Sequence, residues 1–217
     1  MSLNPEQLGI VIRAKNAVSP FDIGACFNIA FAALKRDLLN IVLANFVIGL
    51  VITLVCGLGL IPIIGWIAVM LLVPPLVIGF IRFNAKCVRG QPAALGDCFS
   101  GFDVFGTSVL SYILLALLVL VGTVLCILPG IYLAIAYVFV WNLLADRKGS
   151  AWECLEMSRQ AVTAHWGWAL LLMIVASLLA YAGLIACIIG VFVTMPLYGL
   201  MLAAAYDRLF ADQPPQL

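Results

Sequence analysis

Three long stretches of the chain contain no Asp, Glu, Lys or Arg, and these apolar runs are the dominant pattern of the sequence. They run from Leu38 to Ile81, from Val104 to Ala145 and from Gln160 to Tyr206. A helix that crosses a bilayer needs roughly 20 apolar residues to pass about 30 Å of hydrocarbon. Each stretch is long enough for two such helices, so each predicts a pair of membrane spans.

Glycine and proline residues interrupt each stretch near its middle. The interruptions are Gly57, Gly59 and Pro62 in the first stretch, Pro129-Gly130 in the second and Gly190 in the third. Glycine accepts left-handed backbone angles and proline lacks an amide donor, so both residues end helices. We therefore expect each stretch to fold back on itself as a helical hairpin. The expected spans are 38–57, 62–83, 106–126, 129–145, 166–186 and 189–207.

The three hairpins have the features of internal repeats, at 19–90, 91–149 and 150–210, between an N-terminal segment 1–18 and a tail 211–217. In each unit one cysteine precedes the first span and another lies at the turn. The entry cysteines are Cys26, Cys98 and Cys154, and the turn cysteines are Cys56, Cys126 and Cys187. The predicted fold is an all-α polytopic membrane protein with six transmembrane helices in three hairpin repeats, each preceded by a short interfacial amphipathic helix.

The segments before the first span of each hairpin carry signals for the start of a helix. Ser19-Pro20 predicts an N-cap with proline at the first helical position, and Pro92 repeats the proline signal. Ser150 and Glu153 have the spacing of a capping box, in which each side chain satisfies a free backbone N–H group. These signals predict three helices along the membrane surface. The alternative is that some of these segments simply extend the next span into water.

Composition and charge agree with this picture. The chain is 65% hydrophobic and 10% charged, with a mean hydropathy of +1.21, which is too apolar for a water-soluble surface. Its net charge of +1 implies no nucleic-acid partner, and lipid is the partner that the composition implies. All eleven basic residues fall outside the hairpin turns, so the positive-inside rule predicts that both termini are cytoplasmic. Residues 1–18 lack the apolar core of a cleavable signal peptide.

Candidate chemistry is sparse. Ionisable side chains inside a span mark proton and ion pathways, and the expected spans contain none away from their ends. His165 has no obvious second ligand and is expected at a span boundary. The turn cysteines leave open a shared metal or redox site, although no CxxC pair is present. We therefore expect no catalytic site, no cofactor and no enzyme activity.

Several residues are candidates for a structural role. Pro74-Pro75 lies inside the second expected span, where it predicts a kink. Pro129-Gly130-Ile131 at the second turn, followed by Asp146, Gly149 and Ser158, resembles the pattern of YciC-like bacterial inner-membrane proteins and of the membrane domain attached to some glycerophosphodiester phosphodiesterases. A weaker similarity continues through Gly190, Thr194 and Pro196. The resemblance implies a bacterial inner-membrane module of six helices without an assigned activity, and no phosphodiesterase domain is present in this sequence.

Three hypotheses for function remain after this reading. The leading one is a scaffold or accessory module that binds a protein partner or lipid at the cytoplasmic face. The second is a passive channel or transporter for a neutral or apolar solute, and the third is a cysteine-based metal or redox sensor. A homo-oligomer is compatible with all three.

Overall fold

The computed structural model describes residues 3–17, 21–61, 63–125, 127–182 and 188–210, and every regular element in these ranges is helical. This confirms the predicted all-helical fold for the described residues. In chain order the helices are α1 (Pro5–Lys15), α2 (Ile23–Arg36), α3 (Leu38–Leu58), α4 (Ile64–Val88), the 3₁₀ helix η1 (Leu95–Val104), α5 (Phe105–Leu125), α6 (Ile127–Ala136), α7 (Val140–Ala145), α8 (Ala151–Thr163), α9 (Trp166–Ala182) and α10 (Ile188–Phe210).

Within the described residues, three helical segments are long and apolar enough to cross a membrane, which indicates a membrane protein. They are Leu38–Leu58, Ile64–Val88 and Leu95–Val124, the last of which joins η1 to α5. Helices α8 and α9 make a fourth if they are counted together, although the chain bends by 96° between them. Six spans and a threefold repeat stay predictions.

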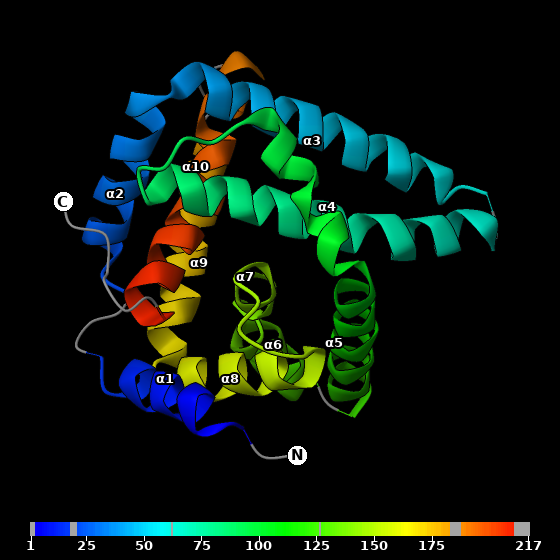
Figure 1. Cartoon of the computed structure of the whole chain (residues 1–217), viewed down its shortest axis with the longest axis vertical. Coiled ribbons are helices and arrows are strands. Elements are labelled where there is room, and N and C mark those ends of the chain that lie inside the picture. The colour runs from blue at the N-terminus through cyan, green and yellow to red at the C-terminus, as the bar shows by residue number, and fades with distance from the viewer. Residues whose placement is uncertain (1–2, 18–20, 62, 126, 183–187, 211–217) are drawn as a thin grey trace.

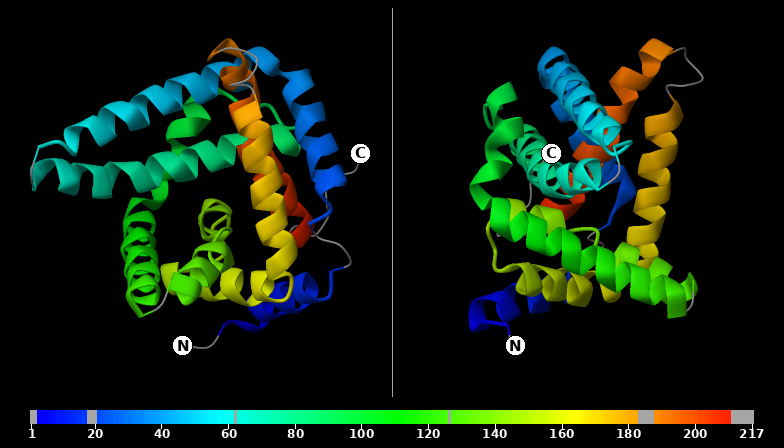
Figure 2. Two further views of the ribbon diagram at one scale, coloured as in Figure 1. Left: turned by 180° about the vertical axis from the view of Figure 1, so that it is seen from behind. Right: turned by 90° about the vertical axis from the view of Figure 1, so that its right-hand side faces the viewer.

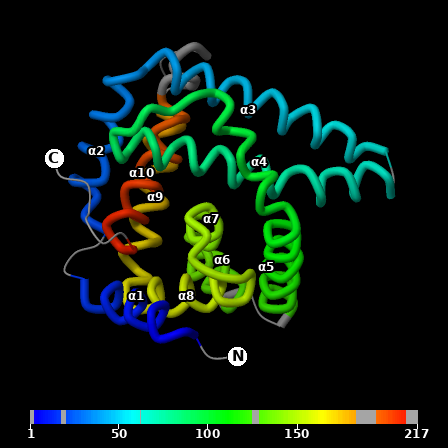
Figure 3. Tube along the Cα trace, viewed as in Figure 1, coloured from blue at the N-terminus to red at the C-terminus, as the bar shows by residue number. Residues whose placement is uncertain are grey.

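The helices do not form one parallel bundle. α3 and α4 lie side by side as a hairpin whose tip projects beyond the other helices, while α9 and α10 run across this pair (Figures 1 and 2). α1 packs against α8, and the trace in Figure 3 turns from α8 into α9 beside it. α4 and α10 contact the most neighbours: α4 contacts α2, α3, η1, α5, α7 and α10, and α10 contacts α1, α2, α3, α4 and α9.

The helix expected at 129–145 is interrupted between α6 and α7. The Val140 amide donates to the carbonyl of Tyr137 at 3.1 Å instead of continuing the α-helical pattern. The carbonyl of Ala136 is therefore released from the helix, and the buried hydroxyl of Ser158 donates to it at 2.8 Å. A buried carbonyl group without a hydrogen-bond partner destabilises the fold. The hydrogen bond from Ser158 offsets this cost at the break.

The helices that precede the expected spans begin at different residues from those predicted in two of three cases. The N-cap of α2 is Asp22, whose carboxylate accepts from the Ala25 amide at 3.1 Å. Ser19 and Pro20 lie outside the described residues. The second helix is 3₁₀ and begins at Leu95 instead of Pro92. There the carboxylate of Asp97 accepts from the Ala94 amide at 2.9 Å, so a local aspartate decides the start, as in α2.

The third start, at Ser150, is confirmed. The Ser150 amide donates to the carboxylate of Glu153 at 2.9 Å, which is the reciprocal bond of a capping box. This bond and a second one from Gln7 lower the pKa of Glu153 below its usual range. Because Gln7 belongs to α1, the cap also fixes the N-terminal helix beside α8.

Helices α4 and η1 approach each other very closely. Pro74 and Pro75 are buried inside α4, which continues through both residues. A Cβ atom at Gly101 of η1 would lie 2.0 Å from the Pro75 carbonyl oxygen, and one at Gly79 of α4 would lie 2.0 Å from the Cys98 carbonyl oxygen. Only residues without a side chain allow the two backbones to come this close.

This contact predicts that Gly101→Ala destabilises the fold by about 1–3 kcal/mol, because the added methyl group must push the two backbones apart. Gly96→Ala is the matched control in the same helix, since a Cβ atom at Gly96 would meet nothing within 4 Å. Equilibrium unfolding in mixed micelles measures both variants. Equal stability of the two variants would contradict the packing described here.

Candidate functional site

The ends of three helices meet at Arg89, which follows α4. Its guanidinium donates to Asp207 of α10 through Nη2 at 2.7 Å and through Nε at 3.0 Å. Nη2 also donates to Asp146, the residue after α7, at 2.8 Å. Only 1% of the Asp207 side chain is exposed, compared with 30% for Arg89. We call Arg89, Asp146, Tyr206 and Asp207 the Arg89 cluster.

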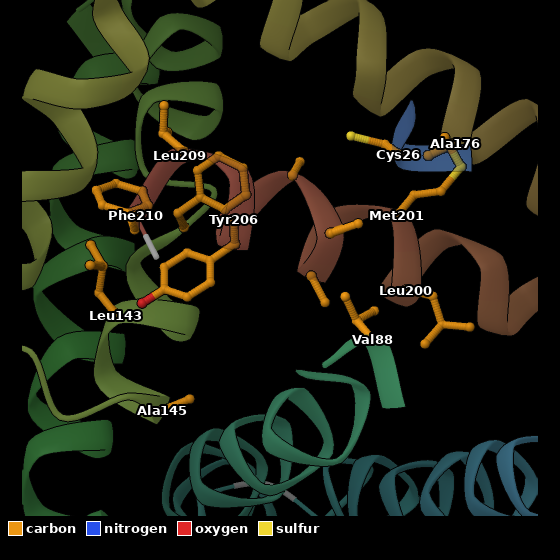
Figure 4. Packing of buried hydrophobic residues seen from close by; sticks show 14 of the residues in the cluster. Cys26, Val88, Leu143, Ala145, Ala176, Leu200, Met201, Tyr206, Leu209 and Phe210 are labelled. Carbon is orange, nitrogen blue, oxygen red and sulfur yellow. The ribbon is translucent and has the colours of Figure 1, made fainter. Parts of the chain in front are cut away.

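The Arg89 cluster is a charge-assisted network with one cation and two carboxylates. The hydrogen bonds to Asp207 and Asp146 raise the pKa of Arg89 above its usual range, so this side chain stays charged. The Tyr206 hydroxyl donates to Asp146 at 3.1 Å. The Tyr206 ring lies beside Phe210, with 5.2 Å between ring centroids, and its hydroxyl points toward the region of Leu143 (Figure 4). The cluster therefore joins a polar network to the aromatic core.

Other basic residues of the segments predicted to be cytoplasmic are also paired within the protein. Arg82 of α4 bonds Asp103 of η1 at 2.8 Å, and Arg147 bonds the same carboxylate. Lys86 pairs with Asp97 at 2.7 Å. These bonds join residues from two predicted cytoplasmic segments. They also neutralise cations that would otherwise attract anionic lipid headgroups.

An apolar cavity of about 420 Å³ lies next to the Arg89 cluster. It is lined by α4, α5, α6, α7 and α10 and is partly open, and its described lining residues carry no charged side chain. The cavity and the Arg89 cluster share helices. Asn84 lies five residues before Arg89, Asn142 lies four residues before Asp146, and Ala203 lies four residues before Asp207. The ion pairs therefore hold together the helices that form the cavity wall.

Asn84 is the unusual residue of this cavity. Its side chain is only 2% exposed, and its Oδ1 atom has no hydrogen-bond partner among the described residues. A Cβ atom at Gly199 would lie 2.7 Å from Asn84 Nδ2, so glycine at this position of α10 makes room for the carboxamide. An unpartnered buried oxygen costs about 1–3 kcal/mol, and a ligand that donates a hydrogen bond removes that cost.

Asp146 is the one residue of the predicted structural set that belongs to this site. Ser158 supports the break before α7, as described above. Gly149 and Gly130 lie at close contacts, where a Cβ atom would be 2.8 Å from Glu153 Oε2 and 2.3 Å from Thr123 Oγ1, respectively. The prolines lie elsewhere: Pro74 and Pro75 are buried in α4, Pro129 is exposed in α6, and Pro196 is buried in α10.

Arg89, Tyr206, Asp207 and Asn84 were not among the candidate residues predicted from the sequence. The second span was expected to end at residue 83, which placed Asn84 in a loop, whereas α4 continues to Val88. One signal could have found this asparagine. Asn84 and Asn142 each stand five residues before an arginine, namely Arg89 and Arg147. In the predicted repeat this shared spacing would correspond to equivalent positions of the first and second units.

The cysteines and His165 form no metal site within the described residues. Cys126 and Cys187 lie outside the described residues, so a site shared by the turn cysteines stays a prediction. Within the described ranges no group of three or more His, Cys, Asp or Glu side chains could hold a metal ion. Burial raises the pKa of the Cys26 thiol to about 11 and that of Cys154 to about 12, so both stay protonated. His165 Nε2 lies 3.2 Å from the carbonyl oxygen of Lys15, at the end of α1.

Comparison with known proteins finds distant relatives of unknown activity. One uncharacterized protein of Mycobacterium bovis and two of Mycobacterium tuberculosis are each 22% identical to the chain over 162 residues. The match covers 75% of this chain and 50% of each relative, so the chain spans about half the length of the curated relatives it matches. No family model matches, and no solved structure matches. The resemblance to YciC-like proteins stays a prediction.

The Arg89 cluster predicts that Arg89→Met destabilises the fold by about 3 kcal/mol, because the buried carboxylate of Asp207 loses its cation. Adding Asp207→Leu should recover more than half of this loss, since no unpaired buried charge then remains at position 207. Arg159→Met is the control. It breaks an exposed pair with Glu156 and should cost less than about 1 kcal/mol. Equal losses for Arg89→Met and Arg159→Met in micellar unfolding would overturn this account.

Proposed function

We propose that the chain is a non-catalytic module of the bacterial inner membrane that binds a lipid-like molecule between its helices. The observation that carries the proposal is the apolar cavity of about 420 Å³ in which Asn84 Oδ1 lacks a partner. Ligand pockets are typically apolar, measure about 300–1,000 Å³ and contain a few polar groups that orient the ligand. This cavity has the same size and the same balance of polar and apolar groups.

The proposal includes six membrane spans with both termini in the cytoplasm. Its support is that charged residues far apart in the sequence bond to one another. Arg82 and Arg89 follow the first hairpin, Asp146 and Arg147 the second, and Asp207 ends the third, and these residues share ion pairs. A common cytoplasmic face for the three hairpin bases explains this convergence, because charges are too costly to gather in hydrocarbon.

An accessory role toward another membrane component is part of the proposal. Phe31 of α2 and Phe99 and Phe102 of η1 each expose 38–43% of their surface, and Lys35 lies 4.4 Å from the centre of the Phe31 ring. Exposed aromatic rings beside a lysine are typical of the headgroup region of a bilayer. Since other basic residues are paired internally, the cavity is better suited than the charged surface to select a lipid.

A passive path for a neutral solute is the second candidate function. The same cavity favours it, since its lining is apolar apart from Asn84, Asn142 and the rings of Tyr137, Tyr198 and Trp141. Flux of neutral solutes into proteoliposomes separates the two functions. A lipid-binding module shows ligand retention without flux above that of empty liposomes, whereas a path shows flux that a cavity-filling variant abolishes.

We expect the protein, extracted from its native membrane into nanodiscs, to retain about one neutral lipid per chain in native mass spectrometry. Ala134→Trp should abolish retention, because Ala134 lines the cavity and a large ring there fills it. Ala116→Trp is the matched control, since Ala116 is an exposed α5 residue that does not line the cavity. Absence of retained lipid in the unaltered protein, or equal retention in both variants, would contradict the proposed function.

The proposed topology predicts that Cys56 reacts with a membrane-impermeant maleimide from outside the cytoplasm. Cys56 is exposed near the α3–α4 turn, whereas Cys26, Cys98 and Cys154 are buried. The measurement uses a chain in which Cys126 and Cys187 are replaced by serine, so that Cys56 is the expected reactive thiol. The buried cysteines should react only after denaturation. Labelling of Cys56 from the cytoplasmic side would overturn the six-span topology.

A further inference from the structure

We propose that the ligand of the cavity is an uncharged long-chain alcohol whose hydroxyl group bonds to the carboxamide of Asn84. This inference rests on the proposed function and specifies its ligand class. The cavity lies between helices that carry the Arg89 cluster on one side and long apolar faces on the other. Its chemistry therefore decides both the headgroup and the tail of the ligand.

The headgroup follows from the Asn84 carboxamide. Asn84 lines the cavity, and its Oδ1 accepts hydrogen bonds but has no donor within the described protein, so a donor on the ligand would satisfy this atom. A hydroxyl group both donates and accepts, and it therefore pairs with the carboxamide whichever way the amide is turned. A methyl ether only accepts, and it leaves Oδ1 without a partner.

The absence of charge follows from the lining. The described lining residues include no Lys, Arg, Asp or Glu, and the nearby Arg82 and Arg89 are already bonded to carboxylates. A fatty acid anion would enter this cavity without a cation to pair with, next to the Asn84 oxygen. Burial of an unpaired charge costs far more than burial of a hydrogen-bonded hydroxyl, so the cavity excludes the anion.

The orientation of the tail follows from the positions of the lining residues along α4. Phe80 and Val77 line the same cavity as Asn84 and lie on the side away from Arg89. Val77 stands roughly 10 Å from Asn84 along the helix axis, at 1.5 Å per residue. Leu115 and Val119 of α5 complete this apolar part of the wall. The hydroxyl group therefore sits near the charged end of the helices, and the hydrocarbon chain extends toward the middle of the predicted span.

The test uses the full chain in nanodiscs and a dodecanol derivative that carries a photoreactive diazirine in its tail. After illumination and proteolysis, we expect adducts on the cavity segments of α4, α5 and α10. Excess dodecanol should remove these adducts. Dodecyl methyl ether should compete about tenfold less well, because a lost hydrogen bond of this kind changes affinity by about that factor. Dodecanoate should compete less well than the ether, because its unpaired charge costs more to bury.

Asn84→Leu should reduce the adducts about tenfold without loss of stability, because it removes an unpartnered buried oxygen from an apolar site. Thermal unfolding of the same sample verifies that the variant is folded. Asn45→Leu is the control, since the Asn45 side chain bonds only to Ile41 of its own helix, at 2.9 Å, and does not line the cavity. Its labelling should match that of the unaltered protein.

The outcomes separate the two proposals. In one outcome Ala134→Trp abolishes labelling, but Asn84→Leu is labelled like Asn45→Leu and dodecyl methyl ether competes as well as dodecanol. The cavity then binds apolar chains, and the hydroxyl assignment is wrong. If the unaltered protein shows no adducts on the cavity segments, both the ligand class and the proposed lipid-binding function fall.

Discussion

The guanidinium of Arg89 fixes the ends of three helices, and the neighbouring cavity depends on this single group. Asp207 is buried on helix α10, where an unpaired carboxylate would cost several kcal/mol. Arg89 removes that cost and also binds Asp146. Separating α4, α7 and α10 would therefore leave the carboxylates of Asp146 and Asp207 without their shared cation. Tyr206 extends the same network into the aromatic core through Phe139 and Phe210. A few charge-assisted bonds thus set the arrangement of a largely apolar molecule.

Fixing these helices leaves a space between them that apolar side chains do not fill. Asn84 lies in that space with an unpartnered oxygen, next to the backbone of Gly199. A fold under selection for stability alone would be expected to replace this asparagine by an apolar residue, because the buried oxygen destabilises the protein. Its presence in an otherwise apolar lining favours a binding role, and the ion pairs on one side supply the rigidity that a selective site needs.

Sequence reasoning succeeded where the signal is local. The lengths of the apolar runs predicted α3 and α5 closely, and the Ser150 capping box was confirmed by its hydrogen bond. Prediction from the sequence was wrong where a contact between residues far apart in the chain decides the backbone conformation. The break before α7 depends on Ser158, which is 22 residues away from the carbonyl that it satisfies. Helix α4 runs to Val88, five residues beyond the span expected to end at residue 83.

The sequence by itself determined that the described chain is helical, that its long helices are apolar enough for a bilayer, and that its charges lie outside three long uncharged stretches. These properties follow from composition and from the spacing of residues within one helix. Only the tertiary structure decided that Arg89 pairs with residues 57 and 118 positions away and that Asn84 faces a cavity. The pattern along one helix carries no information about which distant helix supplies a partner, so the site became visible only once the helices were packed together.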